Sequence, residues 1–144
     1  MSLISQERSR NVERGSMSRS PWLILAPWFL SLVYMAFIFY LSAQSDFPLP
    51  FTVSVGDFFL HTVEYGILGL LLSWALANSG VVKKLVLYVF LIGLFYGATD
   101  EIHQYFIPGR TSSLLDVTAD GLGSFLGSYS FHILRSIKAT ISSL

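Results

Sequence analysis

The chain has 144 residues, which is room for one domain. Apolar residues make up 53% of it and charged residues 12%, against roughly 25% charged in an ordinary soluble domain. So few charges exclude a soluble globular surface and indicate an integral membrane protein. The net charge of zero and the lack of a basic face argue against a nucleic-acid partner. The lack of cysteine excludes disulfides, thiolate nucleophiles and thiolate zinc sites.

The first apolar segment follows a polar stretch, residues 1–19, which we expect to be a disordered cytoplasmic tail. No charged residue occurs between Arg19 and Asp46. A secretory h-region needs only about 7–15 apolar residues, whereas a membrane span needs roughly 20. We therefore expect a retained first helix over residues 21–43.

Three further apolar segments follow in the chain. The predicted helices cover residues 57–78, 81–106 and 114–134. The first of them ends at the turn residues Asn78, Ser79 and Gly80. Pro108 and Gly109 occupy the two central positions expected of a type II turn. Ser113, with Asp116 three residues later, resembles a capping box.

These elements predict an all-α polytopic membrane protein, in which four transmembrane helices form a small antiparallel bundle. The connections after residues 78 and 106 are short, so neighbouring helices should run in opposite directions. Gly93 with Gly97, and Gly123 with Gly127, form two GxxxG patterns. Small residues let helices approach closely in lipid. We expect the helices over 81–106 and 114–134 to be the closest pair.

The basic residues predict the orientation. All but Arg110 fall in places that four spans put on one side: Arg8, Arg10, Arg14, Arg19, Lys83, Lys84, Arg135 and Lys138. Short loops rich in Lys and Arg stay cytoplasmic. We expect a bacterial inner-membrane protein with both termini cytoplasmic, a membrane domain over 20–135 and a short cytoplasmic tail over 136–144.

Most acidic residues fall at the outer ends of the helices or in outer loops. They are Asp46, Asp57, Glu64, Asp100, Glu101, Asp116 and Asp120. Acids contribute little to orientation, so this placement needs another explanation. Spacings of four and three residues put Asp57, His61 and Glu64 on one helix face, and Asp116 and Asp120 are again four apart.

The helix over 81–106 ends with a polar group of its own. Asp100 and Gln104 share a face, Glu101 lies beside them, and Arg110 follows in the next turn. Three helices should therefore direct carboxylates, a histidine and an amide toward one outer cavity, with Arg110 at its mouth.

Ordinary structural roles stay open for some of these residues. Asp57 and Asp116 each follow a serine by three residues, Ser54 and Ser113, as capping carboxylates do. Arg110 would pair with Asp116 if it only fixed the turn. A purely structural polar network is the alternative for the whole cluster. Against it, a charge at the centre of a membrane helix costs about 2.5–3.5 kcal/mol, and less near the ends.

The segment from Asp100 to Arg110 resembles the Asp-Glu-x-x-Gln-x-Phe-x-Pro-x-Arg pattern of the VanZ-like membrane proteins. Asp116, Asp120 and the glycines after them resemble the family's next helix. Asp57, His61 and Tyr65 fall on the family spacing, and residues 41–45 also resemble the family. The resemblance covers roughly residues 30 to 130.

The resemblance implies a membrane protein of a family named for reduced susceptibility to the glycopeptide teicoplanin. Two positions depart from the pattern, because Phe58 replaces a frequent lysine and Asp120 a frequent asparagine. The outer cluster is therefore more acidic than the family pattern, which favours a bound cation or a protonated carboxyl.

We favour an enzyme acting on a lipid or lipid-linked envelope precursor, with Asp100 and Glu101 as acid and base and His61 as proton carrier. The fork of donors on Arg110 suits a phosphate. The substrate-binding candidates are Arg110, Gln104, Tyr65, Asp116 and Asp120. In a metal variant, a divalent cation is the cofactor, since oxygen ligands with one imidazole suit Mg, Mn or Zn. Its ligands would be Asp57, His61, Glu64 and Asp116.

Two other functions stay open. One is a non-enzymatic accessory protein that binds an envelope lipid or another membrane protein. The other is a small proton-coupled transporter, since acids and a histidine within the membrane suit proton relays. Four helices are few for transport unless the chain forms homo-oligomers, which the glycine faces would allow. No nucleic-acid partner is expected.

Overall fold

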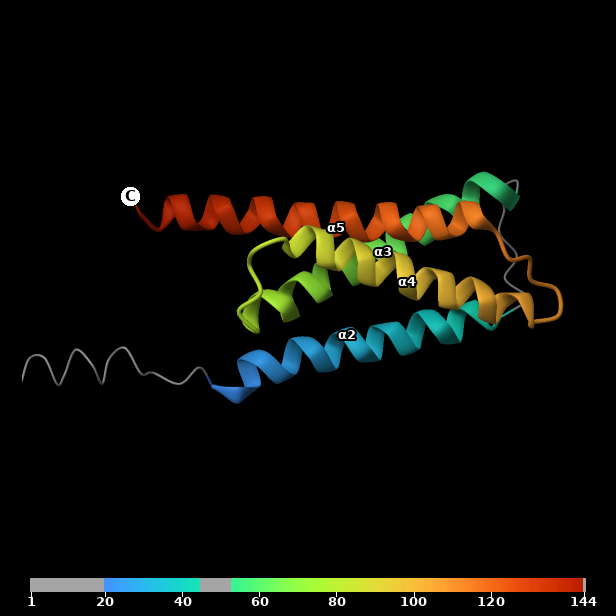
Figure 1. The fold of residues 1–144 in the computed structure, drawn as a ribbon, viewed down its shortest axis with the longest axis horizontal. Coiled ribbons are helices and arrows are strands. Elements are labelled where there is room, and N and C mark those ends of the chain that lie inside the picture. Colours follow the sequence, from blue (N-terminus) through green and yellow to red (C-terminus); the bar gives the residue numbers. More distant parts are fainter. Residues whose placement is uncertain (1–19, 45–52, 144) are drawn as a thin grey trace, which may run out of the picture.

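The computed structural model describes residues 20–44 and 53–143, and within them the fold is all-α with no strand (Figure 1). The helices are α2 (Pro21–Ser42), α3 (Val53–Asn78), α4 (Leu85–Tyr105) and α5 (Leu114–Ile141). The expected tail over 1–19 and the loop containing Asp46 lie outside the described residues.

A glycine turn ends α3. After α3, Gly80 adopts a φ of 90°, the N–H of Val81 donates to the carbonyl of Leu76 and the N–H of Gly80 to that of Ala77. This pair of bonds is a Schellman motif, which requires a residue such as glycine in the left-handed conformation. The expected turn at residues 78–80 is therefore confirmed.

The helix limits differ from the predictions by more than one residue at three ends. α3 begins at Val53 rather than 57, so Asp57 lies inside the helix rather than at its first turn. α4 begins at Leu85 rather than 81, after Lys84 in a left-handed conformation. α5 continues through Ile141, so much of the expected C-terminal tail is helical.

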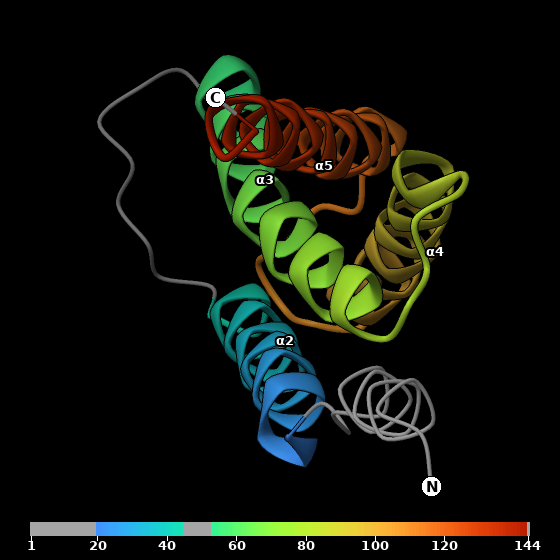
Figure 2. The ribbon, with the colours of Figure 1, turned by 90° about the vertical axis from the view of Figure 1, so that its left-hand side faces the viewer.

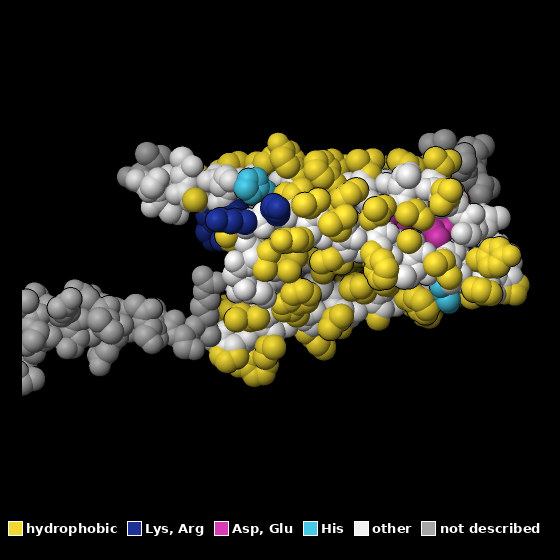
Figure 3. All heavy atoms as spheres, viewed as in Figure 1, with side chains coloured by type: hydrophobic (Ala, Val, Ile, Leu, Met, Phe, Trp, Pro, Cys, Tyr) yellow, Lys and Arg dark blue, Asp and Glu magenta, His cyan; other side chains and the backbone are white. Residues whose placement is uncertain are grey.

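Three helices are long and apolar enough to cross a membrane: Pro21–Ser42, Gly56–Asn78 and Leu85–Tyr105. Large apolar side chains, among them Phe29, Phe95 and Leu126, lie exposed around the helices. The face in Figure 3 shows this apolar surface between an end with Lys and Arg side chains and an end with acidic ones. Lipid is the natural solvent for such a surface.

The closest helix pair is α3 with α5, which corrects the expectation that α4 and α5 pack most tightly. A Cβ at Gly123 would overlap the carbonyl oxygen of Thr62, and one at Gly127 that of Gly66, so both glycines face α3. The other pattern behaves as predicted, because a Cβ at Gly97 would overlap the side chain of Asp120 on α5. The side chains of successive helix residues point in directions about 100° apart, so α5 presents one face to α3 and another to α4.

α2 packs on α3 and α4 and does not contact α5 among the described residues. Figure 2 shows α3 between α2 and α5. The hydroxyl of Tyr34 donates to the carbonyl of Glu64, 3.2 Å away, and that of Tyr96 donates to the carbonyl of Met35, 2.6 Å away. Ile38, which is 2% exposed, belongs to the apolar core. α2 is thereby held against the end of the bundle that carries the polar residues.

Candidate functional site

The start of α3, the end of α4 and the start of α5 lie at one end of the molecule (Figure 1). Buried polar side chains gather there, one or more from each helix. They are His61 from α3, Asp100, Glu101 and Gln104 from α4, and Asp116 and Asp120 from α5. The three-helix convergence expected from the sequence is therefore present.

His61 and Asp120 form the central pair of this cluster. His61 Nδ1 lies 2.9 Å from Asp120 Oδ1, and Asp120 is 0% exposed. Asp120 fits there because its neighbour on α4 is Gly97, at which any Cβ would overlap the carboxylate. Asp120 binds Nδ1 of His61, which fixes the orientation of the imidazole ring and leaves its Nε2 free for another partner.

The two acids of α4 have different partners. Glu101 Oε2 accepts a 2.6 Å hydrogen bond from the backbone N–H of Ser113, which ties α4 to the first turn of α5. Asp100 Oδ2 accepts a 3.2 Å bond from Gln104 Nε2, as their shared helix face predicted.

The N-terminus of α5 only partly matches the predicted capping box. Ser113 is the N-cap, and its Oγ accepts a hydrogen bond from the N–H of Leu115. In a capping box the acid three residues on would accept from the Ser113 N–H. Here Glu101 of α4 accepts from it instead, so the capping role does not explain Asp116.

Arg110 is positioned by a tight turn. Its N–H donates to the carbonyl of Ile107, and Gly109 has a φ of 85°. A positive φ at the third residue of a turn defines type II and suits glycine, so the predicted turn is confirmed.

A cavity of about 90 Å³ lies among these residues. It is lined by Leu41, Ser42, Leu60, His61, Glu64, Asp100, Gln104 and Arg110. The polar members from α3, α4 and the turn were predicted from the sequence. Leu41 and Leu60 were not predicted, and neither was Ser42 of α2, although Ser42 is a polar residue at the polar end of an apolar helix.

Several buried polar atoms in and around the cluster have no hydrogen-bond partner within the described part of the chain. In the cluster they are Asp100 Oδ1, Glu101 Oε1 and Asp120 Oδ2, and around it they are Ser42 Oγ, Tyr65 Oη, His103 Nδ1 and Arg110 Nε. Buried polar groups are nearly always paired with protein or water. A purely structural network would satisfy its own members, so this arrangement favours a site that receives water or a ligand.

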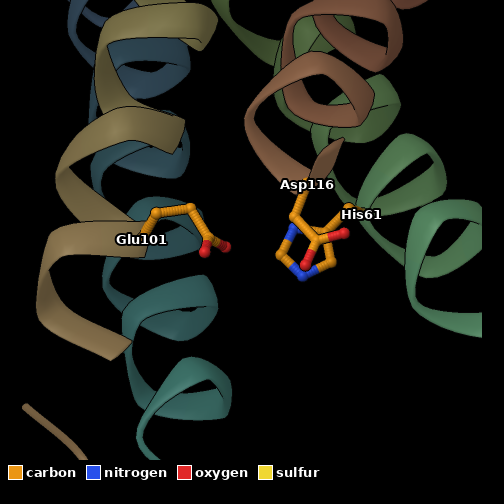
Figure 4. A group of neighbouring side chains, drawn as sticks. All are labelled: His61, Glu101 and Asp116. Carbon is orange, nitrogen blue, oxygen red and sulfur yellow. The ribbon is translucent and has the colours of Figure 1, made fainter. Parts of the chain in front are cut away.

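Three residues that could hold a metal ion lie close together, and they differ from the metal ligands predicted from the sequence. His61, Glu101 and Asp116 each offer a ligand atom, and these atoms lie within 4.8 Å of one another (Figure 4). Glu101 thus joins the group in place of Asp57, which is half-buried, and Glu64, which lines the cavity. Spacing along α3 suggested three of the four earlier ligands, whereas the geometry takes one residue from each of three helices.

Tyr65 and His103 lie at the edges of the cluster. The ring of Tyr65 lies 6.5 Å from that of His61 and 6.0 Å from that of Tyr96, and it is wholly buried. His103 stacks on Phe39 of α2 with ring centroids 3.9 Å apart. Tyr65 therefore remains beside the pair, while His103 packs on α2.

The apolar helices define a multi-pass membrane protein, and the buried polar cluster lies at one end of its helices. The family model described as VanZ/LLP1 matches residues 5–135, and the chain belongs to this family. Neither the comparison with curated proteins nor that with solved structures finds a match.

Proposed function

We propose that this protein acts on the polar head of a lipid or lipid-linked cell-envelope precursor at the outer face of the bacterial inner membrane. The observation that carries the proposal is the cavity of about 90 Å³, which places Arg110 beside His61 and Asp100 next to apolar helices. A cavity of this size accommodates a small polar group, while lipid chains would lie along the exposed apolar helices.

The proposed chemistry assigns each residue a part. Arg110 would hold a phosphate of the head group through its fork of donors. Asp100, whose Oδ1 has no partner among the described residues, and Glu101 would exchange protons with the bound group or its water. His61, fixed by Asp120, would relay a proton. Gln104 and Tyr65 would orient the head group.

We further propose that α5 is a fourth span in an antiparallel bundle with both termini cytoplasmic. Its outward face carries exposed apolar residues, including Leu122, Phe125 and Ile133. The native chain has no cysteine, so single-cysteine variants report topology directly. In spheroplasts, a membrane-impermeant maleimide should label Ser112→Cys at once and Ser143→Cys only after lysis. Immediate labelling of Ser143→Cys would contradict this topology.

The function is tested by the lipids of a deletion strain complemented with wild type, Asp100→Asn, Arg110→Lys or His132→Gln. His132 is exposed on α5 and serves as the control. Mass spectrometry of polar lipids and lipid-linked precursors should show one species that accumulates in the deletion. Wild type and the control should clear it, while the first two variants at equal protein level should not. An unchanged lipid profile in every strain would refute the enzymatic proposal.

The second candidate is a binding protein for the same head group, since the cavity and Arg110 suit recognition without a reaction. Under that reading Asp100→Asn, which keeps a similar shape, would restore the wild-type phenotype, while Arg110→Lys would not. The teicoplanin association in the family name motivates one more comparison. The minimal inhibitory concentration of teicoplanin should fall in the deletion strain and return with the wild-type gene.

A further inference from the structure

We infer that His61, Glu101 and Asp116 form a binding site for one divalent cation. One side chain comes from each of α3, α4 and α5, and their ligand atoms lie within 4.8 Å of one another (Figure 4). All three are mostly buried, with exposed fractions of 7%, 3% and 9%. The three helices therefore bring a histidine and two carboxylates to one point inside the bundle.

Two of the three side chains are held in place by neighbours. Asp120 engages His61 Nδ1 at 2.9 Å, which leaves Nε2 as the ligand nitrogen. The Ser113 N–H engages Glu101 Oε2 at 2.6 Å, while Glu101 Oε1 is buried and has no partner within the described residues. Metal-binding histidines commonly donate their other ring N–H to a carboxylate, and ligating carboxylates are themselves hydrogen-bonded. Because Glu101 Oε1 is buried without a partner, it indicates a ligand independently of the short distances within the group.

The excess of negative charge around the site also favours a bound cation. The acids nearby are Glu64, Asp100, Glu101, Asp116 and Asp120. Arg110 is the one arginine or lysine among the residues that line the cavity. Buried charges are costly unless they are paired or coordinate a metal. A divalent cation would neutralise Glu101 and Asp116 together.

The donor set indicates which cations fit. Carboxylates suit Mg²⁺ and Mn²⁺, imidazole suits Zn²⁺ and other transition metals, and the mixture favours Mn²⁺ or Zn²⁺. Ligand atoms around a tetrahedral zinc with bonds of about 2.0–2.1 Å lie roughly 3.3 Å apart, so modest side-chain rotations would close the site. Three protein ligands leave a coordination position for water or substrate. Because His61 also lines the cavity, that position would border it.

This inference goes beyond the proposed action on lipids and changes two roles in it. With the cation bound, His61 would act as a ligand rather than a proton relay, and Glu101 as a ligand rather than a proton-exchanging group. A water on the cation would then supply the proton-accepting group, since a bound cation lowers the pKa of its water.

The test measures metal content rather than activity. Full-length protein in nanodiscs is incubated with Zn²⁺ or with Mn²⁺, freed of unbound metal by gel filtration and analysed by mass spectrometry for metal per chain. Wild type should retain about one equivalent of at least one metal. His61→Gln, Glu101→Gln and Asp116→Asn should each weaken its affinity by at least about tenfold. His132→Gln and Asp57→Asn, matched changes outside the group, should retain the wild-type affinity.

If the variants fail to fold, the metal content of the wild-type protein still tests the inference. Wild type that retains neither metal overturns the site. Equal loss in Asp57→Asn and Asp116→Asn would overturn the assignment to this group and favour the set predicted from the sequence, Asp57, His61, Glu64 and Asp116. Bound metal with an unchanged lipid profile supports this site and refutes only the lipid proposal. A changed lipid profile without bound metal supports the lipid proposal and refutes the metal site.

Discussion

Gly66 and Gly123 face each other across the α3–α5 interface, yet alanine should have opposite effects at the two positions. A Cβ at Gly66 would lie 3.7 Å from the carbonyl oxygen of Gly123, which is ordinary van der Waals contact. A Cβ at Gly123 would overlap the carbonyl oxygen of Thr62, and backbone cannot rotate aside as a side chain can. Gly123→Ala must therefore push α3 away from α5 next to His61.

The magnitude follows from comparing the two variants. Replacing glycine by alanine within a helix gains about 1 kcal/mol from helix propensity, and this gain is common to both. Overpacking a close contact costs about 1–3 kcal/mol. We therefore expect Gly123→Ala to be about 1–3 kcal/mol less stable than Gly66→Ala. The same displacement should lengthen the 2.9 Å contact between His61 and Asp120.

The assay is reversible unfolding by SDS in mixed micelles, monitored by circular dichroism for wild type and both variants. Gly66→Ala should unfold at an SDS fraction equal to or above that of wild type, and Gly123→Ala well below it. Coincident curves for the two variants would refute the close backbone approach of α3 and α5.

Three further changes test the parts of the site. Gly109→Ala should cost about 1–2 kcal/mol, because Gly109 has a φ of 85° and other residues are strained there; SDS unfolding measures it, and an unchanged midpoint would contradict the turn. Glu101→Ala removes the acceptor for the Ser113 N–H and should cost about 1.5–3 kcal/mol, whereas Glu101→Gln keeps an acceptor and should cost less; equal costs in the same assay would argue against this bond. Asp120→Asn should weaken metal binding about 10–100-fold by loosening the hold on His61, with the effect read by competition against a chelator. Unchanged affinity in that variant would mean that Asp120 does not position the histidine.

The helical class and the membrane location could be read from composition and run length alone, because lipid requires long apolar helices. Turn chemistry likewise placed Gly80 and Gly109 correctly, since a positive φ is a local property of the chain. α5 shows the limit of hydropathy. Its buried side carries Gly121, Ser124 and Ser128 for close packing, and it is not among the helices apolar enough to cross by composition.

The sequence by itself determined which polar residues share a helix face, because helical spacing puts Asp100 with Gln104, and Asp116 with Asp120, on common faces. Only the tertiary structure decided which residues meet across helices. The pairing of His61 with Asp120, and of Glu101 with the backbone of Ser113, depends on how far α4 and α5 are rotated and shifted along their axes. Spacing along one helix holds no information on that rotation, which is set by where glycine permits contact. For this reason the metal group draws one ligand from each helix rather than several from α3.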